Sequence, residues 1–311
     1  MIVITILSLL FSLSKGLIIF PPVTERQNDV FIAPPPQATK FDNCDIFCSF
    51  YPRNVPLVGS KTVYDDRGHS TTFMHTMEGG KHYPASKKIK PGKHDALSTT
   101  SFDSEVPLPY FSWAEYKIQS PQVDFDSAIK GAVFIARNCG SLNDREGLVK
   151  KLQEYIRVDA ISSCLNNAEW PKDIERRDKN GAMRKYLFYL SFENECTDDY
   201  VTEKGWGGLE SGTLPIYYGA PNAHEHFPPM SFIQVTHETV DMVGPLLKRL
   251  SEDKEEYDKY HKWRKEPLPQ AFIEKYKFTH VHGLCRSCHY NKCRHDPSCT
   301  WDKKNQKEIY N

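Results

Sequence analysis

The sequence has no excess of charge of either sign, because 40 Lys and Arg residues balance 40 Asp and Glu residues over 311 positions. This balance excludes a basic chain built for nucleic acid or for an anionic surface, so any anion site must be formed locally. The sequence also lacks internal repeats. No Asn-x-Ser/Thr triplet is present, so N-glycosylation gives no information about the compartment.

Core material is plentiful. Hydrophobic residues make up 39% of the chain and aromatic residues 12%, so we expect ordered structure outside the ends. The length is enough for two domains of ordinary size.

The N-terminal segment from residue 1 to 20 is predominantly apolar and is predicted to be a signal-anchor or a cleaved signal peptide. No basic residue precedes it, and Lys15 would cost about 3 kcal/mol at the bilayer centre. We favour the anchor slightly; a buried N-terminal helix is the third alternative. Either main interpretation directs the chain to the secretory pathway. Residues 21–43 are rich in proline and predict a stem.

Nine cysteines agree with an oxidising compartment, and their odd number leaves at least one free thiol. Four of them lie in the C-terminal tail near His282, His289 and His295, so zinc binding is an alternative to disulfide bonding. We favour disulfides because of the N-terminal segment. The disulfide candidates are Cys44, Cys48, Cys285, Cys288, Cys293 and Cys299.

The remaining chain divides into three parts. Residues 44–125 contain short apolar runs and predict a modest α/β domain, and residues 266–311 form a basic, cysteine-rich tail. Between them, residues 126–265 alternate apolar runs with amphipathic segments, which predicts a doubly wound sheet. The expected strands are 132–136, 157–161, 186–190, one at Leu214 and 231–235, with helices 145–156, 201–209, 240–250 and a surface helix 252–265.

The most informative segment is Phe192–Lys204, which follows the apolar strand 186–190 and precedes a predicted helix. Its polar residues therefore lie at the carboxyl end of a strand, where open α/β sheets bind ligands. Asn, Tyr, Glu and Lys side chains at this position suit a ligand with hydroxyls and phosphates.

Phe192-Glu193-Asn194 is followed six positions later by Tyr200-Val201-Thr202-Glu203-Lys204 and then by Gly-Thr-Leu-Pro-Ile-Tyr-Tyr-Gly-Ala-Pro. This order resembles the signature of the α-1,3-fucosyltransferases, which are inverting enzymes that use GDP-fucose. The segments 110–116 and 137–140 resemble the plant-type branch that modifies the N-glycan core, and 77–84 and 285–288 are similar to further family blocks. Arg137 and Gly140–Asp144 depart from the family pattern.

The resemblance implies a GT-B architecture, in which two Rossmann-like domains face a cleft and the C-terminal domain binds the donor. It also implies donor-binding roles. Lys204, near a helix N-terminus, and Arg145, at the start of another helix, are suited to the pyrophosphate. The full set of donor-binding candidates is Asn138, Arg145, Asn194, Tyr200, Glu203 and Lys204.

The resemblance of Met77-Glu78-Gly79 points to Glu78 as the general base, with Glu105 as the runner-up and Glu193 as a buried hydrogen-bonding residue. No Asp-x-Asp stands where a metal-dependent glycosyltransferase holds its cation, and we do not interpret His75, His82, His224 and His226 as ligands. We therefore expect no essential metal or cofactor, although Asp198-Asp199 could hold a stimulatory divalent cation loosely.

These features predict a Golgi-membrane α-1,3-fucosyltransferase with a lumenal catalytic domain, which becomes a secreted enzyme if the leader is cleaved. Its partners would be GDP-fucose and a glycoprotein acceptor, with the N-glycan core GlcNAc as the first acceptor. A lactosamine acceptor, a non-catalytic glycan-binding module and a zinc-binding interaction protein are the alternatives.

Overall fold

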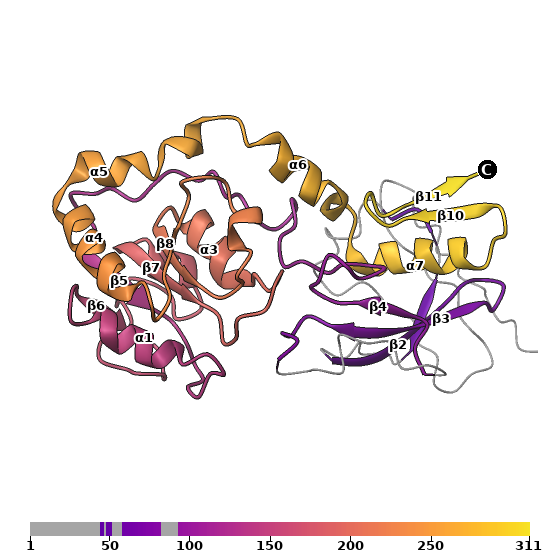
Figure 1. Cartoon of the computed structure of the whole chain (residues 1–311), viewed down its shortest axis with the longest axis horizontal. Helices are drawn as coiled ribbons and strands as arrows, with labels where there is room; N and C mark the ends of the chain where they lie inside the picture. Colours follow the sequence, from indigo (N-terminus) through magenta and orange to yellow (C-terminus); the bar gives the residue numbers. More distant parts are fainter. Residues whose placement is uncertain (1–43, 47, 52–57, 82–92) are drawn as a thin grey trace, which may run out of the picture.

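The computed structural model describes residues 44–46, 48–51, 58–81 and 93–311 and shows two bodies arranged along its long axis (Figure 1). The predicted leader (1–20) and stem (21–43) lie outside the described residues. Among the described helices, none has the length and apolar character needed to cross a membrane.

The C-terminal body contains a five-stranded sheet whose neighbouring strands are all parallel, in the order β6-β5-β7-β8-β9. All seven residues of the central strand β7 are buried, as expected of a parallel strand covered on both faces. The strands are β5 Ile129–Phe134, β6 Val158–Ala160, β7 Tyr186–Phe192, β8 Leu214–Tyr218 and β9 Ile233–Gln234, which confirms the predicted alternation.

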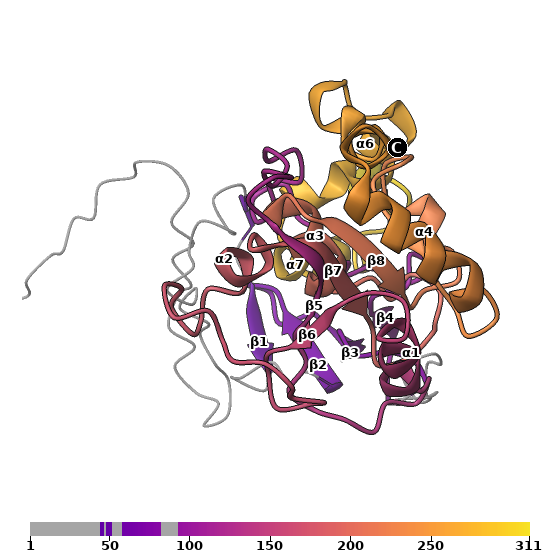
Figure 2. The ribbon, with the colours of Figure 1, turned by 90° about the vertical axis from the view of Figure 1, so that its left-hand side faces the viewer.

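Helices cover both faces of this sheet (Figure 2). α1 (Arg145–Leu152) and α4 (Val240–Glu252) pack together on one face, and α2 (Lys179–Met183) and α3 (Glu203–Ser211) pack together on the other. α3 begins two residues later than predicted because Thr202 caps it, with its side chain accepting the backbone N–H of Lys204. The helix ends at Gly212, whose φ of 82° is left-handed and suits glycine.

The strand order determines where a ligand can bind. β5 lies between β6 and β7, so the connections leaving β5 and β7 run to opposite faces of the sheet and open a crevice at the carboxyl ends of these two strands. The segment 135–144 and the segment 193–202 border this crevice, so the order of the strands brings Arg145 and the Phe192–Lys204 segment together.

The N-terminal sheet differs from the expected Rossmann-like domain. Its order is β1-β2-β3-β4, with antiparallel pairs except for the parallel β3–β4 pair. The strands are β1 Ser49–Tyr51, β2 Val58–Tyr64, β3 Ser70–Thr76 and β4 Ala96–Ser98. The described part of 44–125 contains no helix, and the helix that packs on this sheet is α7 (Gly283–Arg294) from the C-terminal tail. Its apolar partner thus comes from more than 180 positions away in the sequence, which local patterns do not show.

The chain returns from the C-terminal body to the N-terminal sheet through short helices (Figure 1). The expected single helix 252–265 is instead α5 (Lys254–Lys259) and a 3-10 turn, η4 (Lys262–Lys265). Arg264 in this turn is buried and donates to the carbonyls of Ile118, Ser120, Leu209 and Thr213. The remaining elements are η3 Ala223–Glu225, α6 Gln270–Tyr276, η5 Lys277–His280, β10 Cys299–Asp302 and β11 Lys307–Tyr310.

Disulfides join the two ends of the described chain. The pairs Cys44–Cys285 and Cys48–Cys288 link the first described segment to α7, and Cys293–Cys299 links α7 to β10. All six predicted disulfide candidates are therefore paired. A fourth pair, Cys139–Cys164, was not predicted; its members follow the adjacent parallel strands β5 and β6, and that shared edge was the available signal. Cys196 is the free thiol.

A lysine is buried between the N-terminal sheet and α7. The Lys61 ammonium lies 3.3 Å from the hydroxyl of Ser287 and 5.4 Å from the centre of the Phe73 ring. Burial, with a smaller contribution from Arg286, lowers the pKa of Lys61 to about 7 from the ordinary 10.5. The charged form is thus disfavoured by folding.

We expect Lys61→Met to raise the free energy of unfolding by about 2–4 kcal/mol at pH 6, because it removes this poorly compensated charge. The lowered pKa makes the penalty full below pH 7 and lets it fade as the pH rises toward 10.5, so the gain should shrink by pH 9. Urea unfolding at pH 6 and at pH 9 measures the change in the free energy of unfolding. The exposed Lys304→Met is the matched control, and an equal gain at both pH values would contradict this account.

Candidate active site

A buried glutamate organises the start of α3. Glu193 follows β7, is fully buried, and accepts two bonds of 2.7 Å from Thr202, one from its backbone N–H and one from its hydroxyl. Its Oε2 also lies 3.1 Å from Nζ of Lys204. The predicted role of Glu193 as a buried hydrogen-bonding residue is consistent with these contacts, which fix the N-terminus of α3 against the end of β7.

Lys204 is the cation at this helix N-terminus. Its ammonium lies 3.4 Å from Glu203 as well as near Glu193, and its side chain keeps about 20% exposure. Burial alone would lower the pKa of Lys204, but the two carboxylates outweigh it and raise the pKa above its ordinary value. Lys204 is therefore charged at neutral pH and lies at the N-terminus of α3, a position that favours anions.

Arg145 joins the two sides of the crevice. Its guanidinium is 5% exposed and donates to the carbonyl of Phe192 (3.0 Å), the carbonyl of Asn138 (2.8 Å) and Oε1 of Glu146 (3.3 Å). Among the six candidates for binding the sugar-nucleotide donor, Asn138 thus contacts Arg145 through its backbone carbonyl. The arrangement fastens the segment after β5 to the end of β7.

Asn194 has an unsatisfied acceptor at the same edge. Its side-chain Oδ1 is buried and has no hydrogen-bond partner, whereas its backbone carbonyl accepts the N–H of Leu142 at 3.0 Å. Unpaired buried acceptors are rare because each one sacrifices hydration. A ligand with a hydroxyl or N–H donor would satisfy this atom.

The candidate base is held by tyrosines. The hydroxyl of Tyr200 donates to Oε2 of Glu78 at 3.4 Å, and the hydroxyl of Tyr110 donates to the adjacent Met77 carbonyl at 3.0 Å. Burial, followed by the charge of Glu193, raises the pKa of Tyr200, so its phenol stays protonated and remains a donor. The backbone N–H of Glu78 also donates to the Thr76 hydroxyl at 2.9 Å, which orients the turn after β3.

A cleft of about 470 Å³ lies between the two bodies. Of the predicted catalytic and donor-binding residues, only Glu78 lines it; the carboxylate of Glu105 instead accepts the Leu97 backbone N–H at 2.7 Å. The donor candidates surround the crevice next to it. The cleft is lined by Glu78, Gly80, Lys81, Leu97, Thr99, Thr100, Ser101, Asp103, Ser104, Cys196, Thr197, Asp198, Asp199 and Pro221.

The match to a known family covers the C-terminal body and continues through α7 and β10. Residues 125–305 match the model of the C-terminal region of glycosyltransferase family 10 (fucosyltransferase), which is more than half of the chain. The chain belongs to glycosyltransferase family 10.

Proteins from several organisms are similar to this chain over different lengths. A fucosyltransferase-like protein of Arabidopsis thaliana is 31% identical over 253 residues, which cover 80% of this chain and 48% of that protein. Human GDP-fucose protein O-fucosyltransferase 3 is 34% identical over 140 residues, covering 42% and 29% of the two chains. This family 10 chain therefore spans about half the length of the Arabidopsis relative.

Solved structures of α1,3-fucosyltransferase are also similar. The one with GDP-fucose has a TM-score of 0.41 at 24% identity, covering 55% of this chain and 46% of that chain. The one with GDP has a TM-score of 0.44 at 23% identity, covering 58% and 50%.

Asp199 is a functional candidate that sequence reasoning considered only as part of a loose cation site. The Asp199 carboxylate accepts hydrogen bonds from the ring of His226 (3.1 Å), from Asn222 Nδ2 (2.9 Å) and from the backbone N–H of Phe102 (2.9 Å). Burial opposes its charge, but the bonds from His226 and Phe102 hold the pKa of Asp199 below its ordinary value. Its φ of 64° is left-handed. Asp199 therefore links the two sides of the cleft, and protein donors already occupy its oxygens.

Glu195 makes a second link between the bodies and was not predicted. It is fully buried and accepts the backbone N–H of Lys81 at 3.0 Å and the hydroxyl of Thr197 at 2.5 Å. Gly79 allows this approach, because a Cβ at that position would lie 2.0 Å from the Glu195 carboxyl carbon. A side chain at the position after Glu78 would therefore displace the Glu195 carboxylate.

Gly79→Ala should lower the free energy of unfolding by about 1–3 kcal/mol, because the Glu195 carboxylate must move and release the Lys81 N–H. Gly207→Ala is the matched control. It lies within α3, where the nearest atoms are 3.5 Å away, and alanine should stabilise that helix by up to about 1 kcal/mol. Denaturant unfolding compares the two variants, and equal stability would contradict the packing argument.

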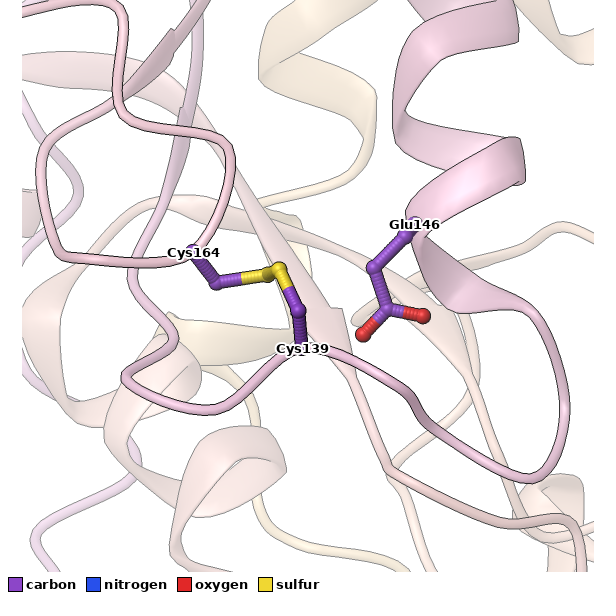
Figure 3. A group of neighbouring side chains, drawn as sticks. All are labelled: Cys139, Glu146 and Cys164. Atoms are coloured by element: carbon purple, nitrogen blue, oxygen red, sulfur yellow. A yellow bond between two sulfur atoms is a disulfide. The ribbon is translucent and has the colours of Figure 1, made fainter.

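The described residues contain one group with the geometry of a metal site, and it is not a metal site (Figure 3). Ligand atoms of Cys139, Glu146 and Cys164 lie within 4.8 Å of one another, but the two sulfurs are bonded to each other. A disulfide offers no thiolate. The Glu146 carboxylate already accepts from the Ser141 hydroxyl at 2.6 Å and from Arg145.

Proposed function

We propose that the chain is an inverting α-1,3-fucosyltransferase that transfers L-fucose from GDP-fucose to a GlcNAc hydroxyl, with the N-glycan core GlcNAc as the first acceptor. The observation that carries this proposal is the placement of Glu78. Its carboxylate lines the cleft and accepts a hydrogen bond from Tyr200 of the C-terminal body, next to the crevice that holds Lys204 and Arg145. A GT-B arrangement, with donor and acceptor bound on opposite bodies, accounts for this placement.

In the proposed reaction, the acceptor oxygen attacks C1 of fucose while its proton passes to Glu78. The bond between C1 and the phosphate oxygen breaks, and GDP leaves with the electron pair. Lys204 and the N-terminus of α3 stabilise the charge that develops on the departing diphosphate, and Arg145 adds to it from the start of α1. The unpaired Oδ1 of Asn194 accepts a donor hydroxyl or N–H.

A protein hydroxyl is the second acceptor class. It is favoured by the similarity of 140 residues to the protein O-fucosyltransferase 3 sequences, which are 34% identical in human and 36% in zebrafish. A lactosamine acceptor and a non-catalytic module that retains the nucleotide site are further alternatives. Four disulfides are compatible with the proposed lumenal placement in the Golgi, or with secretion.

Incubation with labelled GDP-fucose and a panel of acceptors, in EDTA and with added Mg²⁺, tests the proposal. The panel contains an N-glycan core glycopeptide, lactosamine and a folded protein with exposed Ser and Thr. Label on the core GlcNAc in EDTA supports the enzyme, its acceptor and its independence of metal. GDP binding without transfer to any acceptor would support the non-catalytic module. Folded protein that does not bind GDP would overturn the donor assignment.

A further inference from the structure

One wall of the cleft is an irregular loop, residues 99–105, which we call the wall loop. Thr99, Thr100, Ser101, Asp103 and Ser104 of this loop line the cleft opposite Cys196–Asp199. Four of these five side chains carry hydroxyls, of which Thr99, Thr100 and Ser104 are buried and Ser101 is partly exposed, and the fifth is an exposed carboxylate. Such groups can donate to or accept from a ligand rich in hydroxyls.

The wall loop contains no strand or helix, and the Glu105 carboxylate at its end accepts the backbone N–H of Leu97 in β4 at 2.7 Å. Towards the C-terminal body, the backbone N–H of Phe102 and the hydroxyl of Ser101 donate to Asp199 at 2.9 and 3.4 Å. Within the loop, the hydroxyls of Thr99 and Ser104 lie 2.6 Å apart. These contacts hold the middle of the loop. The backbone carbonyls of Asp103 and Glu105, at its end, accept from donors elsewhere in the chain.

Those donors come from the hairpin of β10 and β11 at the C-terminal end, which lies next to α7 in Figure 1. Trp301 Nε1 and Gln306 Nε2 each donate to the Glu105 carbonyl at 3.0 Å, and the Lys303 ammonium contacts the Asp103 carbonyl. About 200 positions of sequence separate the partners.

The hairpin donors are themselves rigidly placed. Gln306 is 6% exposed, and its Oε1 accepts Nη1 of the buried Arg286 at 3.1 Å. The ring of Trp301 packs edge-on against Tyr290 of α7, with ring centres 5.5 Å apart. The disulfide Cys293–Cys299 joins the end of α7 to the first residue of β10. These contacts and the disulfide hold the hairpin against α7.

We propose that the C-terminal hairpin positions the acceptor side of the cleft, with Trp301, Lys303 and Gln306 holding the wall loop so that its less buried cleft residues, Ser101 and Asp103, meet a hydroxyl-rich acceptor. This inference rests on the proposed function. Trp301, Lys303 and Gln306 are positioning residues: they act on the cleft through the carbonyls of the wall loop, and the loop contacts the acceptor. The donor crevice, on the other body, does not depend on them.

The test combines Trp301→Phe with Lys303→Met, which removes two donors while keeping an aromatic ring against Tyr290. The expected result is a five- to tenfold rise in KM for the acceptor, the scale of about one lost hydrogen bond. KM for GDP-fucose and the Kd for GDP should be unchanged. Lys304→Met, which alters an exposed neighbour in the same turn, is the control.

Hydrogen exchange followed by mass spectrometry supplies a readout that does not need activity. Backbone amides of residues 99–105 should exchange faster in the double variant, with unchanged exchange in β7 and α3. Wild-type exchange in the loop would overturn the proposal, as would equal rises in KM for donor and acceptor, which indicate a general loss of stability. If the unmodified chain transfers to no acceptor, the proposed function fails, while faster exchange still supports the hairpin's hold on the loop.

Discussion

Replacing Glu78 with Gln should lower kcat for fucosyl transfer by about 10²–10⁴-fold, the range typical of losing a general base. The amide has nearly the same shape and can still accept the Tyr200 hydroxyl, so the turn after β3 should keep its conformation. Lys204 and Arg145 are bonded to Glu193 and to the Phe192 carbonyl rather than to Glu78, so the Kd for GDP should not change. Rates under saturating donor and calorimetry with GDP measure the two effects.

Asp103→Asn is the matched control, because Asp103 is another carboxylate that lines the cleft. It should alter the KM for the acceptor and retain most of kcat. Full activity of Glu78→Gln would mean that another residue is the base. Glu105, the alternative from the sequence, would be tested next, although its carboxylate is bonded to the Leu97 N–H.

The second large effect is expected at Lys204. Lys204→Met should weaken GDP binding by about 10- to 100-fold, since a hydrogen bond to a charged group contributes about 1.5–3 kcal/mol. The same change leaves the fully buried Glu193 without its cation and should lower the free energy of unfolding by about 3 kcal/mol. Loss of binding alone therefore does not separate a ligand contact from a damaged fold.

A double variant separates them. Glu193→Gln with Lys204→Met removes the unpaired charge as well, so stability should recover while GDP affinity stays low. Calorimetric titration with GDP at a temperature well below the unfolding midpoint gives the affinity, and urea unfolding gives the stability. Normal GDP affinity in the stable double variant would show that Lys204 only supports Glu193.

Local sequence patterns were enough to predict the parallel sheet of the C-terminal body. The buried run at β7 and the alternation of strands and helices are properties of adjacent residues, and the structure confirms them. The N-terminal sheet was not predictable in the same way. Its strands are short, and the helix that covers it, α7, lies in a tail that looked like a separate cysteine-rich segment.

The candidate site also combines features that local patterns predicted with contacts that they did not. The spacing from Asn194 to Lys204 identified the crevice, but nothing local indicated that Glu195 reaches Lys81 or that Asp199 binds the backbone of Phe102. Both contacts cross between the bodies. A carboxylate in a loop has the same local signature whether it faces solvent, a ligand or another segment.

The sequence by itself determined the family, the parallel sheet and the six disulfide candidates, because hydrophobic periodicity, motif spacing and cysteine content are properties of nearby residues. Only the tertiary structure decided which cysteines pair, that Glu78 meets Tyr200 across the cleft, and that the hairpin supports the wall loop. Apart from Cys293–Cys299, whose members are 6 positions apart, these contacts join positions about 120 to 240 apart. Such pairings depend on how the two bodies pack, which no local pattern encodes.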